Sequence, residues 1–195
     1  MRGEGFVAAL AAAQAGEEAG FAALYHEFAP SVLGFLRGRV AGEAEDVAAS
    51  VWLDVARSVN RFVGEEVGFR AWLFTIVRRR MMNEFRRRSR DRTVATDPAR
   101  LPDAIALDDP AQHVVDGSAS VEAVALIGSV LPELQGDVVL LRVVAQLPVE
   151  DVARILNLTP GHVRVLSHRG LQTLAQHFSR DGVTPSVGPG ISEVP

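Results

Sequence analysis

The sequence predicts an all-α protein made of two small helical domains, and two observations support this prediction. Apolar residues recur at the three- and four-residue spacing of amphipathic helices through 21–90 and again through 119–178. Between these stretches, residues 93–118 contain three prolines and five aspartates and show little periodicity. We therefore expect the following organisation: a helical domain at 1–92, a flexible acidic linker at 93–118, a second helical domain at 119–178 and a disordered tail at 179–195.

Composition excludes several classes of protein. The 195 residues are 48% hydrophobic, which is enough to build small cores. The absence of cysteine excludes disulfides, cysteine-ligated zinc and thiol catalysis, and it suits a reducing cytoplasm. No apolar run approaches the roughly 20 residues that span a bilayer, and the first residues lack the order of a signal peptide. We expect a cytoplasmic protein that does not insert into a membrane.

Three helices are expected in the first domain. The first follows apolar residues from Phe21 to Leu36, and Pro30 predicts a kink or a break near Ala29 because proline removes a backbone donor. The second begins near Gly42–Glu45, where acidic side chains suit the positive end of a helix. Valines spaced four apart give it a buried face: Val47, Val51, Val55 and Val59.

The third helix runs from about Phe69 to Arg90 and changes character along its length. It begins with an apolar face, where the spacing places Trp72 in the core. From Arg78 to Arg92 there are eight arginines against two acids, a cluster that favours a polyanion such as DNA over a merely solvated helix end. The preceding loop, 60–68, contains two glycines.

The second domain contains the pattern of a helix-turn-helix. Helices are expected at about 119–131, 132–146, 148–156 and 160–178. Asn157 suits a left-handed turn between the last two, and Thr159 suits the N-cap of the last. The last helix is expected to bury Val163, Leu171, Leu174 and Phe178. Its polar outer face suits the major groove, although an ordinary helical hairpin remains an alternative at this point.

Three segments of the first domain, at 44–47, 69–78 and 86–90, carry a recognisable set of motifs. They resemble region 2 of the sigma-70 family of RNA polymerase sigma factors. Region 4 is represented by 131–135, 140–142 and the turn that leads into 163–169. Region 3 is absent and a short linker replaces it, which is typical of the extracytoplasmic-function (ECF, group 4) class. The chain departs from the family pattern at Arg79, Asn83 and Leu166, among others, so a promoter sequence does not carry over from relatives.

The resemblance implies a sigma factor that binds core RNA polymerase and directs initiation at promoters with −35 and −10 elements. It implies no enzymatic activity, no catalytic residue, no cofactor and no metal. The implied partners are the β′ clamp helices and the β flap of the polymerase, promoter DNA and an anti-sigma factor, and we expect the free chain to be a monomer. Because the net charge is −4 and the linker is acidic, we expect the free chain to bind duplex DNA poorly.

The resemblance also implies three sets of site residues. The polymerase-binding set is Glu45, Asp46, Ser50 and Asp54. The set for the −10 element is Asn60, Arg61, Arg78, Arg79, Arg80, Asn83, Arg86, Arg87, Arg88 and Arg90. The set for the −35 element is Thr159, His162, Arg164, Val165, His168 and Arg169.

Three other functions remain open on the sequence alone. The chain could be a sigma-like adaptor or decoy, because several polymerase- and DNA-binding positions depart from the family pattern. It could be a stand-alone helix-turn-helix regulator, although 21–90 does not resemble a ligand or dimerisation domain. A helical enzyme is the least favoured, because there is no glycine-rich phosphate loop, nucleophile motif or acid pair, and the histidines lack metal-site spacing.

Overall fold

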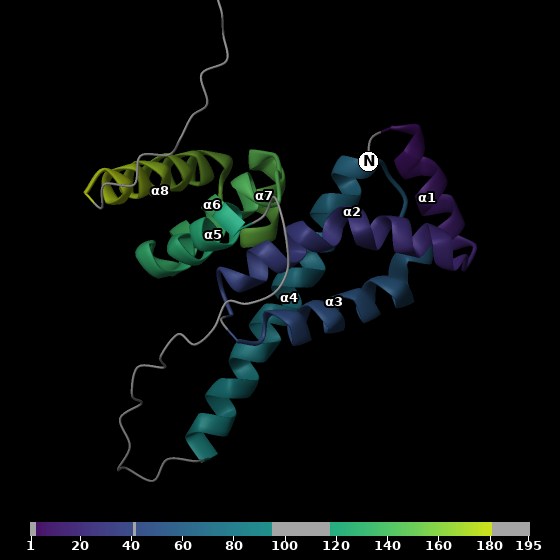
Figure 1. The fold of residues 1–195 in the computed structure, drawn as a ribbon, viewed down its shortest axis with the longest axis horizontal. Helices are drawn as coiled ribbons and strands as arrows, with labels where there is room; N and C mark the ends of the chain where they lie inside the picture. The colour runs from purple at the N-terminus through teal and green to yellow at the C-terminus, as the bar shows by residue number, and fades with distance from the viewer. Residues whose placement is uncertain (1–2, 41, 95–117, 181–195) are drawn as a thin grey trace, which may run out of the picture.

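The computed structural model describes residues 3–40, 42–94 and 118–180, and these residues form α-helices, one short 3-10 helix and no strand. The all-α prediction is confirmed. In chain order the elements are α1 (Glu4–Gln14), α2 (Glu18–Arg37), α3 (Ala44–Ser58), η1 (Val59–Arg61), α4 (Glu66–Val94), α5 (Ser118–Val130), α6 (Glu133–Val143), α7 (Val149–Leu156) and α8 (Pro160–Arg180). Figure 1 shows α1 to α4 gathered as one unit and α5 to α8 as another.

The N-terminal unit forms around the valine stripe of α3 and the apolar start of α4. Val51 and Val55 are fully buried, as the four-residue spacing predicts. Proline was expected to kink or break α2 near Ala29; the break is wrong, because the helix continues through Pro30. Proline removes the donor for the carbonyl of His26, but both residues are exposed, so water can satisfy that carbonyl. Phe28, on the opposite face, is fully buried and keeps the helix on the core.

Helix α1 was not expected from the sequence. Its Phe6 is almost completely buried and lies edge-on to Phe28 at 6.4 Å and to Phe69 at 5.5 Å between ring centroids. A Cβ at Gly20 would collide with the backbone of Ala13, so the α1–α2 hairpin closes only with glycine there. The Ala-rich first residues therefore belong to the core of this unit.

The C-terminal unit contains the predicted helix-turn-helix. Asn157 adopts the left-handed conformation (φ 56°, ψ 49°) at the end of α7, and the hydroxyl of Thr159 accepts a hydrogen bond from the amide of His162 at 3.2 Å. One prediction for α8 is wrong, because Leu171 is 48% exposed. Its neighbour Gly170 takes the buried position, where a Cβ would lie 2.6 Å from Val139, so α8 crosses α6 at a glycine.

The two units pack against each other, with α5 beside α2 and α7 beside α4 (Figure 1). The contact at α2 is close, because a Cβ at Gly128 would collide with the carbonyl of Gly38. The expected linker begins within α4, which continues to Val94, and its remaining residues 95–117 lie outside the described residues. The tail is likewise undescribed from 181 onward. No helix in the described part of the chain is long and apolar enough to cross a membrane.

Candidate nucleic-acid and polymerase interface

The basic face of α4 is braced by acids that come from the preceding elements. Asp54 of α3 accepts hydrogen bonds from Arg79 at 3.1 Å and from Arg80, and its side chain is only 12% exposed. The hydrogen bond from Arg80, assisted by Arg79, holds the pKa of the Asp54 carboxyl below its usual range although burial opposes this. Sequence reasoning placed Asp54 on the polymerase-binding face, but its carboxylate is directed toward α4.

A second set of acids braces the C-terminal part of α4. Glu43, which precedes α3, accepts a hydrogen bond from Arg88 at 2.9 Å, and Glu84 pairs with Arg87 at 2.8 Å. Arg87 lowers the pKa of the Glu84 carboxyl, again against burial. The eight arginines therefore do not simply repel one another, because part of their charge is neutralised within the unit.

An open cleft lies where α4 meets α7. Its α4 wall is polar and cationic, its α7 wall contributes Ile155, and it is lined by Thr75, Arg78, Arg79, Met82, Asn83, Arg86 and Ile155. The Nε of Arg78 is buried and has no hydrogen-bond partner among the described residues. Three arginines and an asparagine from the predicted −10 set thus face a space that the C-terminal unit partly covers.

The loop before α4 presents two of the predicted −10 residues to solvent. Asn60 and Arg61 lie in η1, and both are exposed. Below them, the ring of Phe62 packs against Phe69 and Trp72, each at 5.3 Å between centroids. Trp72 is half-buried against the core, in agreement with the core position that its spacing predicts.

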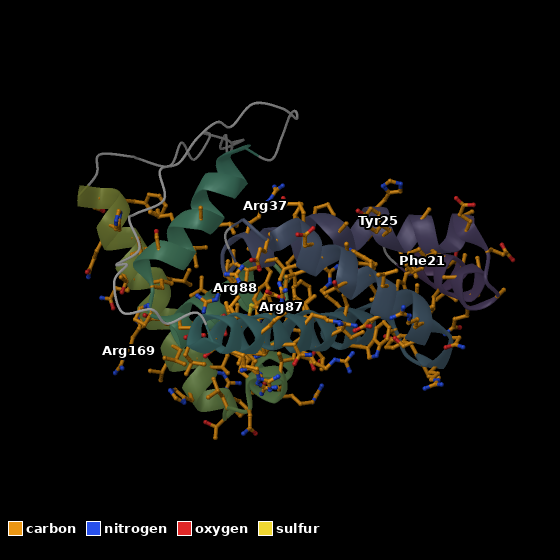
Figure 2. The ribbon with its side chains drawn as sticks, turned by 90° about the horizontal axis from the view of Figure 1, so that it is seen from below. Phe21, Tyr25, Arg37, Arg87, Arg88 and Arg169 are labelled. Atoms are coloured by element: carbon orange, nitrogen blue, oxygen red, sulfur yellow. The ribbon has the colours of Figure 1, made fainter. Side chains whose placement is uncertain are left out.

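The outer face of α3 contains the expected acids and one apolar residue that sequence reasoning missed. Asp46 is exposed, and Glu45 pairs with Arg37 of α2 at 2.9 Å, which lowers the pKa of the Glu45 carboxyl (Figure 2 labels Arg37). Ser50 is half-buried. Leu53 is 57% exposed and lies eight residues, about two turns, after Glu45 on the same stripe. That spacing was visible in the sequence.

All six residues predicted for the −35 element are exposed on α8 or at its start. Arg164 pairs with Glu150 of α7 at 3.3 Å, with both side chains more than half exposed. Figure 2 shows Arg169 of α8 far from Phe21 and Tyr25 of α2, with Arg87 and Arg88 of α4 between them. The two predicted DNA surfaces therefore lie on different units of the molecule. Within the described residues, no three histidine or acidic side chains are placed to hold a metal ion.

Comparison with known proteins now assigns the two units. Residues 24–91 match the family model for sigma-70 region 2, and residues 128–174 match the model for sigma-70 region 4. The ECF RNA polymerase sigma factor ShbA of Streptomyces griseus is 30% identical over 145 residues, which cover 70% of this chain and 74% of ShbA. The chain belongs to the ECF class of the sigma-70 family. This class of protein directs transcription initiation at particular promoters, as the motifs in the sequence predicted.

Two further similarities describe how far the family likeness extends. The ECF RNA polymerase sigma factor BldN of Streptomyces coelicolor is 29% identical to this chain over 171 residues, which cover 87% of this chain. The matched stretch covers only 64% of the length of BldN. A solved structure, of CnrH in complex with the cytosolic domain of CnrY, has a TM-score of 0.58 at 18% identity and covers 91% of this chain and 99% of that one. The likeness to CnrH shows that the two folds agree.

Proposed function

We propose that this ECF sigma factor binds core RNA polymerase and carries it to promoters, with α4 and the 59–65 loop at the −10 element and α8 at the −35 element. The observation that supports this most directly is the position of the two predicted DNA surfaces. The −10 arginines lie on one family-matched unit and the six −35 residues lie exposed on the other. Two modest DNA sites on one chain act together once both are available, because binding at one raises the effective concentration at the other.

We assign polymerase docking to the outer face of α3, with the β′ clamp helices as the partner. Asp46 is exposed and Glu45 lies beside it, so both carboxylates face solvent at the positive end of the helix. The exposed Leu53 adds an apolar contact on the same stripe. Asp54 is assigned a different role from the one the sequence suggested, since it holds Arg79 and Arg80 in place on α4. The C-terminal unit would contact the β flap.

The packing of the two units supports the expectation that the free chain binds DNA only weakly. Ile155 of α7 lines the same cleft as Arg78 and Arg86, so the C-terminal unit stands where DNA would approach α4. Core polymerase would separate the units and uncover the arginines. An anti-sigma factor is a further proposed partner, as CnrH has a protein partner in CnrY. The chain itself acts without an enzymatic step.

Transcription in vitro tests this function. Purified core polymerase is supplied with a pool of genomic promoters and with wild type, Asp46→Ala or the double variant Arg86→Ala/Arg87→Ala. The matched control is Glu18→Ala, which removes an exposed acid at the start of α2, outside the region 2 match. Initiation from a discrete set of promoters, weakened by both test variants and unaffected by the control, is the expected result.

Two other outcomes would select a rival function. Association with core polymerase without initiation at any promoter would favour an adaptor or decoy. No association with core polymerase would leave a stand-alone DNA-binding protein and would overturn the proposal.

A further inference from the structure

One side chain of α1 reaches across to the loop that precedes α4. The amide nitrogen of Gln14 donates hydrogen bonds to the backbone carbonyl of Val59 at 3.0 Å and to that of Phe62 at 2.7 Å. Because both partners are carbonyl oxygens, the amide nitrogen must face them, and its two hydrogens are both used. Gln14 is partly buried and is the last residue of α1, so the contact joins the end of one helix to the loop.

The two carbonyls belong to a short turn, and only that of Val59 has a partner within it. Residues 59–61 form a single turn of 3-10 helix, which leaves terminal carbonyls without partners inside the helix. The carbonyl of Val59 also accepts the amide of Phe62 at 3.1 Å, which closes the turn. Gln14 therefore holds the first and the last residue of the closed turn with one side chain.

The side chain of Phe62 is held from the opposite direction. Its ring contacts Phe69 and Trp72 of α4, and the loop passes over the ring at Gly64, where a Cβ would lie 3.1 Å from Phe62 Cζ. Gly64 has a φ of 151°, which side chains rarely adopt. The backbone of Phe62 is thus tied to α1 and its ring to α4, which gives the loop one defined shape.

That shape directs the loop residues Asn60, Arg61 and Val63 to solvent, with Val63 94% exposed. Helix α1, which carries Gln14, is fixed to the same aromatic cluster, because the buried ring of Phe6 packs edge-on against both Phe28 and Phe69. Helix α1 lies outside the stretch 24–91 that matches sigma-70 region 2. The shape of a loop inside region 2 therefore depends on a residue outside it.

We infer that Gln14 is a positioning residue for promoter recognition, because it holds the 59–65 loop in the shape that presents Asn60 and Arg61 to the −10 element. The inference rests on the proposed function of the loop. Gln14 does not contact DNA in this account. Without Gln14 the loop keeps its residues but loses its single defined shape. Discrimination between bases therefore decreases at the −10 position that the loop contacts.

The test measures base preference and not only activity. Holoenzyme is assembled with wild type, Gln14→Leu or Gln14→Asn and transcribes a promoter library randomised at each −10 and −35 position. Leucine keeps the bulk of glutamine without its donors, and asparagine keeps the amide but is one methylene too short to reach both carbonyls. The control is Gln176→Leu, the same change at an exposed position of α8.

We expect both Gln14 variants to reduce the preference for the favoured base at one −10 position by about tenfold, roughly the effect of losing one or two hydrogen bonds. Preferences at the −35 positions and affinity for core polymerase should stay at the wild-type level, and Gln176→Leu should change neither preference. In the background Asn60→Ala/Arg61→Ala, adding Gln14→Leu should reduce discrimination no further, because Gln14 acts only through the two residues that it positions.

Several results would overturn the inference. Equal weakening of all promoters, with base preferences intact and a lower melting temperature, would show that Gln14 only stabilises the fold. Unchanged preference in folded Gln14→Asn would show that the loop keeps its shape without the second hydrogen bond. If wild-type holoenzyme initiates at no promoter, the proposed function fails first, and this outcome is distinguishable because it does not depend on the variants.

Discussion

Arg39, just after α2, and Asp137 of α6 form a buried ion pair between the two units. The Nε of Arg39 lies 2.7 Å from Oδ1 of Asp137, and each side chain is 7% exposed. The atoms are close but not aligned for a hydrogen bond, so neither has a hydrogen-bond partner among the described residues. Burial raises the pKa of the Asp137 carboxyl, and the attraction of Arg39 and Arg78 only partly opposes it. The contact between the units thus places a carboxyl with a raised pKa beside a buried guanidinium, and it is tightest when that carboxyl is protonated.

Replacing Asp137 by alanine should separate the units. The change removes the oxygen nearest the buried guanidinium of Arg39, an acceptor that Asp137 offers in either protonation state, and leaving a buried donor without a partner costs about 1–3 kcal/mol. Separation returns Arg39 to water and removes that cost, so the packed arrangement loses population. The chain has no cysteine, so dyes can be attached through Glu18→Cys and Gln176→Cys, and energy transfer between them should decrease.

The matched control for this change is Glu150→Ala, which breaks an exposed ion pair with Arg164 in the same unit. Exposed pairs contribute little, so energy transfer should stay at the wild-type value. Equal transfer in Asp137→Ala and wild type would contradict the role assigned to the buried pair.

The packed arrangement should weaken as the pH rises. The pKa of Asp137 is raised where the units pack, and it returns to the ordinary carboxyl range when they separate. Between those two values the packed arrangement binds a proton that the separated one releases, so protons favour packing. The preference is complete below the ordinary range and is lost as the pH rises through the raised pKa. Energy transfer should therefore fall with rising pH across this window.

Asp137→Asn is the control for the pH dependence, since the amide has no proton to release. Its energy transfer should lack the decrease seen in wild type, while Arg39, Arg78 and Glu133, the charged groups that affect Asp137, remain in place. A decrease of the same size in both proteins would assign the pH dependence to other groups.

Much of each unit follows from local pattern, because the forces that shape it act between near neighbours. The valines of α3 and the turn at Asn157 and Thr159 are examples, since helix periodicity and capping are read over a few residues. Helix α1 was missed because two of its four buried residues are alanine, the residue type that also fills much of its exposed face. Leu171 was misplaced because the crossing of α8 over α6 selects Gly170 instead.

The parts of the candidate site that were missed depend on residues far apart in the chain. The pairs of Asp54 with Arg80 and of Glu43 with Arg88 join positions separated by 26 and 45 residues, and they exist only because α3 packs on α4. The Arg39–Asp137 contact crosses the stretch 95–117 and has no local signal at all. Charge counts along the sequence cannot show which arginines are already paired.

Removing Asp54 should make the protein less stable and a better nonspecific DNA binder. The pKa of its carboxyl is lowered chiefly by Arg80, so the pairing stabilises the fold above the ordinary carboxyl range and is lost as the pH falls through the lowered value. At neutral pH we expect Asp54→Ala to cost about 1 kcal/mol, since the Arg79 side chain is 63% exposed and that of Arg80 is 35% exposed, which weakens both pairs. Urea unfolding measures this loss.

The same change leaves Arg79 and Arg80 without their acid, so both become available to phosphates. The slope of log affinity against log salt should steepen by about 0.9 for each phosphate newly contacted, as measured by fluorescence anisotropy with a nonspecific duplex. Glu45→Ala, which breaks the more exposed pair with Arg37, is the control for stability and should change it little. An unaltered salt slope in Asp54→Ala would show that other groups still hold the two arginines.

Replacing Thr159 by alanine should weaken recognition of the −35 element by loosening the start of α8. Its hydroxyl accepts the amide of His162 at 3.2 Å, and loss of such a cap costs about 1 kcal/mol. The residues that follow the cap, His162 and Arg164 among them, are exposed and predicted to meet DNA, so fraying there acts on the interface itself. We expect reduced initiation from promoters that need both elements and little change on templates with a pre-melted −10 region.

Thr173→Ala is the control for this change, because the Thr173 hydroxyl donates a hydrogen bond to the carbonyl of Arg169 within α8 and caps no helix. Equal losses on both templates would indicate that Thr159 supports the fold of the unit and not the −35 contact.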